Sequence, residues 1–446
     1  MRFIETLKNI WKIEDLRNRL LTTFLFVLIY RFGSFIVLPG IDPGALTALK
    51  AQTSGGLLGL LNMFSGGAFA NASIFALGIM PYISASIVIQ LLTIAVPYFQ
   101  KMQREGESGR RKMNQITRYL TVVILLLQGP SYLVNLKVQM LQAGAQYPEG
   151  VWFSLSSTLI LCAGSMFVMW LGERITDKGI GNGISFIILV GIIARFPGAV
   201  IKEFAFRLTD AGGGLVMFLL EVIFLLVVIA ASILLVQGTR KIPVQYAKRV
   251  VGNKQYGGVR QYIPLKVNAA GVMPIIFAQA IMFIPITIVG FSRADGLGGF
   301  WGMFMDNNGW LYNLVFALLI IAFTYFYTAI TINPTQIAED MKRNNGFVPG
   351  VKPGKKTAEY IDTIMSRITL PGSFFLAIVA VMPAFASVLG INQEFAQFFG
   401  GTSLLILVGV VLDTLQQIES HLLMRHYDGL LKSGRIKGRT GSVSAY

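Results

Sequence analysis

Long apolar stretches recur along this chain, and they constrain its fold more than any other feature. A helix needs about 20 mostly apolar residues to cross a bilayer. Of the 446 residues, 54% are apolar and 13% are charged, whereas soluble domains have about 25% charged residues. The sequence therefore predicts an all-α polytopic membrane protein with ten transmembrane helices, at 20–38, 73–97, 114–136, 152–171, 183–201, 214–236, 269–290, 310–332, 369–389 and 401–420.

The net charge of +16 suggests a nucleic-acid binder at first, but the positions of the basic residues favour a different explanation. Of the 38 Lys and Arg residues, 31 lie in the alternate segments that include both termini, and six lie on the opposite side. Basic loops stay in the cytoplasm, so both termini are expected there. The first span is too long for a signal-peptide core and ends in Leu38-Pro39-Gly40, so we expect it to be retained.

The sequence offers few groups for catalysis or metal binding. Its one cysteine is Cys162, and its two histidines, His421 and His426, form no zinc-site pattern. Residues 350–357 approach a phosphate-binding loop, but the glycines are one residue too close and Lys356 replaces the Ser or Thr that would hold magnesium. We therefore expect no enzymatic activity, no metal and no cofactor.

Three ionisable residues lie well inside the predicted spans, away from the span ends: Arg31, Glu221 and Asp413. Such residues are candidates for function because a charge in lipid is costly. Arg31 and Glu221 lie toward the outer halves of their spans, where they could pair or snorkel, so a structural role is favoured. A secondary transporter with broken helices remains an alternative, although a proton-coupled one would normally have more such groups.

An eleventh apolar segment, 57–70, is too short to cross the membrane, and its glycine pair at 66–67 indicates a bend. Irregular backbone at membrane depth must be buried in protein or line a water-filled cavity. This favours a re-entrant helix that stops a pore, with an interfacial helix as the alternative. Residues 1–19 have apolar side chains at helical spacing, which predicts an amphipathic helix on the cytoplasmic surface.

Two long basic loops, 237–268 and 333–368, are expected on the cytoplasmic side. Long ordered loops often carry function, although charge that merely sets the topology is the alternative. The first loop has two β-favouring stretches around a Gly/Asn turn, which predicts a hairpin.

Seven motifs, in order over essentially the whole chain, resemble those of the SecY family, the channel subunits of the bacterial Sec protein translocase. They lie at 62–67 (NMFSGG), 73–86 (SIFALGIMPYISAS), 179–185 (GIGNGIS), 264–268 (PLKVN), 333–334 (NP), 347–350 (FVPG) and 400–405 (GGTSLL).

The resemblance implies two inverted, pseudo-symmetric halves of five helices, 20–201 and 202–420, followed by a cytoplasmic tail, 421–446. It implies a plug at 57–70, with Asn62, Met63, Phe64, Ser65, Gly66 and Gly67 at its motif. It also implies a pore ring of Ile79, Ile83, Ile184, Ile188, Ile276 and Ile406. The spacing of these isoleucines cannot identify a ring, because aliphatic i, i+4 pairs are usual in membrane helices.

The function implied by the resemblance is a protein-conducting channel in the bacterial inner membrane. Unfolded secretory preproteins with signal sequences would cross it, and transmembrane segments would leave into lipid between the second and third spans and the seventh and eighth. The implied partners are SecE, SecG, the SecA motor ATPase and the ribosome, with SecDF and YidC as further candidates. The docking residues would be Lys248, Arg249, Lys254 and Lys352, although the family commonly has Arg in place of Lys352.

Overall fold

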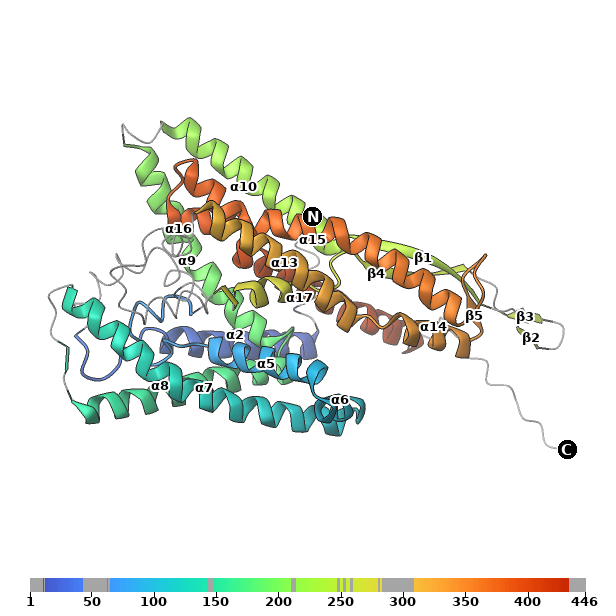
Figure 1. Ribbon diagram of the computed structural model, residues 1–446, viewed down its shortest axis with the longest axis horizontal. Coiled ribbons are helices and arrows are strands. Elements are labelled where there is room, and N and C mark those ends of the chain that lie inside the picture. The colour runs from blue at the N-terminus through green and yellow to red at the C-terminus, as the bar shows by residue number, and fades with distance from the viewer. Residues whose placement is uncertain are drawn as a thin grey trace.

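The chain folds into a bundle of long helices with a small sheet at one end (Figure 1). This computed structural model describes residues 11, 13–42, 62, 65–142, 147–148, 150–209, 214–246, 249–251, 254–256, 260–279, 281–282 and 309–432. Its helices are α2 (Glu14–Gly33), α5 (Met80–Ala95), α6 (Pro97–Arg104), α7 (Glu107–Gln142), α8 (Val151–Lys178), α9 (Gly183–Arg207), α10 (Gly214–Gln237), α13 (Trp310–Thr331), α14 (Pro334–Arg343), α15 (Lys355–Val388), α16 (Gln393–Ala396), the 3₁₀ helix η2 (Gln397–Phe399) and α17 (Gly401–Lys432).

The predicted all-α polytopic class is confirmed. Within the described residues, seven helical stretches are long and apolar enough to cross a membrane, and the bent pair α5–α6 makes an eighth if counted as one span. The first expected span corresponds to α2, which starts earlier, with Glu14 and Asp15 in its first turn. The expected span at 269–290 and the amphipathic helix at 1–19 lie partly outside the described residues.

The second span begins seven residues later than its hydropathy predicts. Residues 65–79 form successive turns, with Ser73 bridged to Val37, and α5 begins only at Met80. Gly66, Gly67 and Gly78 have positive φ, which a right-handed helix cannot contain. At the other end of α5, Val96 is extended because Pro97 follows it, and α6 bends away by 101°.

The two long basic loops share one sheet, and the predicted hairpin is confirmed. Strands β1 (Thr239–Tyr246) and β4 (Arg260–Lys266) pair antiparallel, with the smaller hairpin β2 (Arg249–Val251) and β3 (Lys254–Tyr256) between them. The second loop adds β5 (Gly346–Phe347), which pairs with the end of β1. A separate apolar core fastens the sheet to α14 and α15; its buried members are Ile242, Val244, Leu265, Met341, Val348, Ile361 and Met365.

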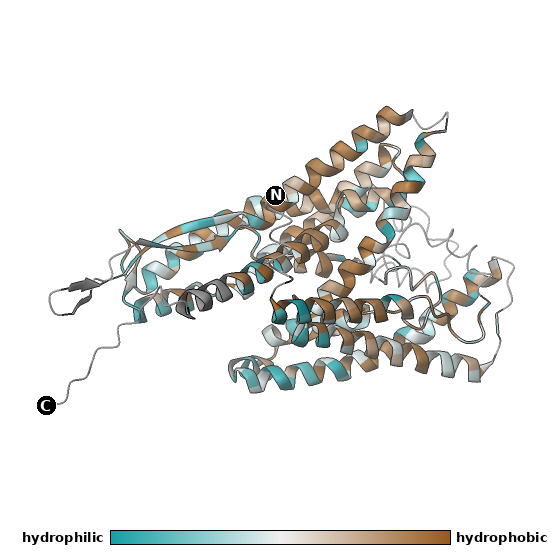
Figure 2. Ribbon diagram, turned by 180° about the vertical axis from the view of Figure 1, so that it is seen from behind, coloured by the Kyte–Doolittle hydropathy of each residue, from teal (hydrophilic) through white to brown (hydrophobic). Residues whose placement is uncertain are grey.

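Hydrophobic residues cover the long helices, whereas hydrophilic residues gather around α6, α14 and the β1–β4 hairpin (Figure 2). This is the distribution expected of a membrane bundle with a polar end. A large buried cluster, here called the central cluster, joins α2, α5, α8, α9, α10, α15, α16, η2 and α17.

Candidate functional site

The central cluster contains five of the six isoleucines expected in the pore ring. Ile79, Ile188 and Ile406 are buried members, and Ile83 and Ile184 are half-buried and pack against it. Ile276 is half-buried and is the one ring candidate that the described residues do not place in this cluster. Three separate parts of the chain, at α5, α9 and α17, therefore bring aliphatic side chains to one place.

The start of α9 fixes the positions of Ile184 and Ile188, the two isoleucines of that helix expected in the ring. The Asn182 side chain caps the helix, because its Oδ1 accepts hydrogen bonds from the backbone N–H of Ile184 (3.1 Å) and Ser185 (3.3 Å). Ile184 and Ile188 then share one face, four residues apart. Gly172 of α8 allows close approach, since a Cβ at this position would lie 3.0 Å from Ile184 Cγ1.

Of the other isoleucines expected in the ring, Ile79 and Ile83 are positioned by the start of α5, and Ile406 is positioned by α17. Ile79 immediately precedes α5, and its carbonyl accepts a hydrogen bond from the Ile83 N–H at 3.1 Å. Ile406 lies in the second turn of α17 and is 4% exposed. A narrow passage lined by such side chains offers water no hydrogen-bonding partner, so it closes to ions by dewetting.

The described part of the expected plug is a tightly hydrogen-bonded turn. The carbonyl of Asn62 accepts a hydrogen bond from Gly67 N–H at 2.8 Å, and its side-chain Oδ1 accepts one from Ala70 N–H at 3.0 Å. Ser65 Oγ accepts a hydrogen bond from the Phe69 N–H at 3.0 Å. Met63 and Phe64 lie outside the described residues.

Side chains of α2 and the backbone of α9 hold this turn from two sides. Arg31 Nη1 donates to the carbonyl of Gly66 at 2.5 Å, and the Tyr30 hydroxyl donates to the carbonyl of Ser65 at 3.2 Å. A Cβ on Gly66 would lie 2.9 Å from the Cα of Gly191 in α9. The turn thus lies directly against the helix that carries Ile184 and Ile188.

The expected docking residues that the structure describes lie outside the shared sheet, in the separate β2–β3 hairpin and in the segment between β5 and α15. Arg249 is the first residue of β2 and Lys254 is the first residue of β3. Lys248 lies outside the described residues. Lys352 is exposed, and its carbonyl accepts a hydrogen bond from Thr357 Oγ1 at 2.9 Å. The pairing of β1 with β5 brings the two basic loops together, which the sequence did not predict.

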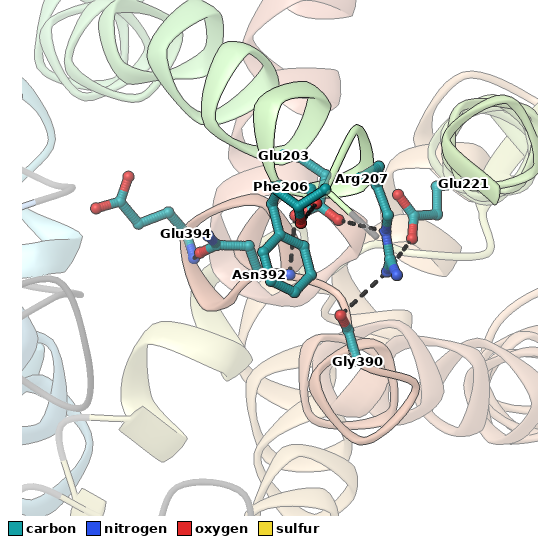
Figure 3. A network of polar contacts seen from close by, with 8 residues as sticks. Glu203, Phe206, Arg207, Glu221, Gly390, Asn392 and Glu394 are labelled. Carbon is teal, nitrogen blue, oxygen red and sulfur yellow. Dashed lines mark hydrogen bonds and ion pairs between the residues drawn. The ribbon is translucent and has the colours of Figure 1, made fainter. Parts of the chain in front are cut away.

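A buried ionic network at the carboxyl end of α9 was also missed from the sequence (Figure 3). Arg207 Nε donates to Glu203 Oε1 at 2.9 Å, and Arg207 Nη2 donates to Glu221 Oε1 of α10. The predicted span ends at 201, so hydropathy places both Glu203 and Arg207 in a loop. The i, i+4 spacing of Glu203 and Arg207 is the signal that could have revealed a longer helix.

Comparison with known proteins identifies the family. A SecY family model matches residues 73–415. The protein translocase subunit SecY of Streptomyces scabiei is 44% identical over 435 residues, which cover 95% of this chain and 98% of the relative.

Solved structures share the fold at low identity. A SecY translocation channel, whose plug domain is described as stabilising its closed state, matches with a TM-score of 0.62 and 16% identity over 96% of this chain and 95% of the other. Sec61 in a canine ribosome–channel complex matches with a TM-score of 0.55 and 16% identity over the same shares. The family model and the relative together establish that this chain belongs to the SecY family.

Proposed function

We propose that unfolded polypeptides cross the membrane through the central cluster and that apolar segments leave it sideways into lipid. The chain belongs to a family of translocase subunits, and the structures that share its fold are protein-conducting channels. It is a multi-pass membrane protein with the function of a protein-conducting channel. The matches give no support to a secondary transporter.

The observation that carries the proposal is the convergence of ring isoleucines from α5, α9 and α17 in one buried cluster. Branched aliphatic side chains exclude water from a closed pore, yet they have no strong bonds to break when a chain displaces them. We propose Ile79, Ile83, Ile184, Ile188 and Ile406 as this ring, with Ile276 joining it from the segment that precedes α13.

The turn that contains Ser65 and Gly66 is proposed as the base of a plug. Few side-chain bonds hold it to α2, and they end on backbone carbonyls, so they can be released without altering α2 itself. Its contact with Gly191 links displacement of the plug to the helix of the ring. A passing polypeptide would break these contacts in turn.

Lateral release follows from the energetics of partition. Each Leu in a segment favours lipid by about 0.3–0.6 kcal/mol and each Arg opposes it by about 2.5–3.5 kcal/mol, so roughly a dozen Leu-like residues outweigh one charge. We propose that segments leave between α5 and α7 on one side and the 269–290 span and α13 on the other, so that signal sequences and transmembrane segments enter lipid while polar chains continue across.

The sheet that joins the two basic loops is proposed as the docking surface for the machinery that drives transport. A ribosome-bound channel shares the fold, and ribosomal RNA would favour positive charge. We propose the ribosome and the SecA motor as alternative occupants, SecE and SecG as membrane subunits, and SecDF and YidC as transient partners. The proposed location is the bacterial inner membrane with cytoplasmic termini, and the chain itself is proposed to catalyse no reaction.

Crosslinking to a stalled nascent chain tests the proposed path. A photoreactive residue at Ile188, in the ring, should react with a signal-bearing chain held in the channel. The matched control is Leu226 of α10, which is 59% exposed on the outside of the bundle. Equal reaction at both positions would contradict a path through the ring, and saturable uptake of a small solute by the purified chain alone would favour the transporter.

A further inference from the structure

The connection between α8 and α9, residues 179–183, is here called the α8–α9 turn, and side chains of α2 and α8 hold it. Thr23 Oγ1 of α2 accepts a hydrogen bond from the Ile180 N–H at 3.2 Å, and Thr176 Oγ1 of α8 accepts one from the Gly183 N–H at 2.9 Å. Both hydroxyls are themselves fixed, because each donates to a carbonyl one turn earlier in its own helix. The turn is therefore expected to move together with α2 and α8.

A hydrogen bond from α17, far away in the sequence, reaches the same turn. The Gly181 N–H donates to Gln417 Oε1 at 2.8 Å. Gly181 has a positive φ of 80°, and a Cβ there would lie 3.2 Å from Thr414 Oγ1, so α17 lies directly against the turn. Gly181 and Gln417 are both half-buried. Water can therefore replace this bond when the two segments part, so breaking it has a modest net cost.

Gln417 is aligned with the ring candidate of its own helix. It follows Ile406 by about three helical turns, so both side chains lie on one face of α17. On the other side of the bond, Gly181 closely precedes Ile184 and Ile188, the ring candidates of α9. The bond therefore connects the two helices that bring these three isoleucines into the central cluster.

We propose that Gln417 is a positioning residue that latches the closed ring by binding the α8–α9 turn. While the Gly181 N–H is bonded, α17 and the start of α9 stay together and hold the ring isoleucines in one cluster. When a polypeptide enters, the turn stays with α2 and α8, and the bond to Gln417 breaks. The latch is separate from the proposed plug, whose bonds come from Tyr30 and Arg31. This inference rests on the proposed function, because it assumes that the ring widens around a polypeptide.

Removing the acceptor tests the latch. Gln417→Leu leaves the Gly181 N–H without its partner, and ion conductance in planar bilayers should rise about threefold or more, because a hydrogen bond of ordinary net strength shifts an equilibrium by that factor. Gln417→Glu keeps an acceptor oxygen and should conduct like the parent protein. Gln416→Leu, at the exposed preceding residue of α17, is the matched control and should also conduct like the parent. Equal conductance of Gln417→Leu and Gln416→Leu would overturn the proposal.

A covalent tie across the latch gives the complementary test. In a Cys162→Ser background, Gly181→Cys and Thr414→Cys are joined by mild oxidation, since a Cβ at 181 would lie 3.2 Å from the Thr414 hydroxyl, within reach of a disulfide. Signal-dependent transport in proteoliposomes should fall in proportion to the joined fraction and return on reduction. Gly181→Cys alone, treated with the same oxidant, controls for strain at the positive φ and should not respond. Full transport through joined channels would overturn the proposal.

Crosslinking at Ile188 separates failure of the latch from failure of the proposed function. If the parent protein captures a signal-bearing chain at Ile188 while Gln417→Leu conducts like Gln416→Leu, the latch fails and the proposed function stands. If the parent protein crosslinks no nascent chain at Ile188, the proposed function fails, and the latch that rests on it fails too.

Discussion

Replacing Arg207 by alanine should destabilise this protein strongly. The change leaves Glu203 and Glu221, whose side chains are 0% and 4% exposed, without the guanidinium that lies between them. Removing one partner of a buried ion pair typically costs about 3–5 kcal/mol, because the remaining charge stays buried and uncompensated. The variant also removes the donor to the carbonyl of Gly390, so the upper part of that range is expected.

Two further variants separate the buried charge from other effects. Neutralising all three positions together, with Glu203→Gln, Arg207→Met and Glu221→Gln, keeps the volumes but leaves no isolated charge. It should recover most of the stability, since a neutral replacement of a buried pair is often tolerated. Lys202→Met removes the neighbouring pair with Glu394, in which the lysine is 60% exposed and the glutamate 17% exposed. Because water reaches the lysine, the loss should cost about 1 kcal/mol or less.

Thermal unfolding of the purified proteins, all in the same detergent, measures these differences in stability. Unfolding is monitored through the loss of the monodisperse peak. Arg207→Ala should lower Tm by several degrees, and the other two variants should remain near the parent protein. Equal Tm values for Arg207→Ala and Lys202→Met would refute the reasoning. A triple variant as unstable as Arg207→Ala would show that the lost hydrogen bonds, and not the isolated charges, determine the stability.

Three further changes test the pore and the docking surface. Ile83→Asn with Ile188→Asn should wet the ring and raise ion conductance severalfold in planar bilayers, and an unchanged conductance would count against the ring. Gly66→Ala should raise ion conductance more than Gly67→Ala. Both glycines have positive φ, which costs an alanine about 1–2 kcal/mol. Only at position 66 would the added methyl group also meet another backbone, 2.9 Å from the Cα of Gly191. Lys352→Glu should slow motor-driven export while the channel still assembles; loss of assembly with normal transport through the remaining channels would contradict a docking role.

Hydropathy predicted the membrane helices because lipid leaves the backbone few alternatives to a helix. It failed where local geometry or a distant partner decides the structure. The start of α5 is delayed by positive φ at Gly78 and nearby residues, to which an apolar scale is insensitive. Strand β5 has two residues and exists only because β1 offers an edge. Arg207 can be buried at the end of α9 because Glu203 on the same helix and Glu221 on α10 both neutralise it.

The proposed ring shows the same division between local and distant causes. Spacing alone puts Ile184 and Ile188 on one face of α9. Many other aliphatic pairs four residues apart also share a helix face, so only the family resemblance singles out these two. The structure adds the reasons for their position: the cap formed by Asn182 sets where α9 begins, and Gly172 lets α8 approach Ile184. The register of the proposed ring on this helix is therefore fixed by polar and small residues that no hydrophobic pattern reveals.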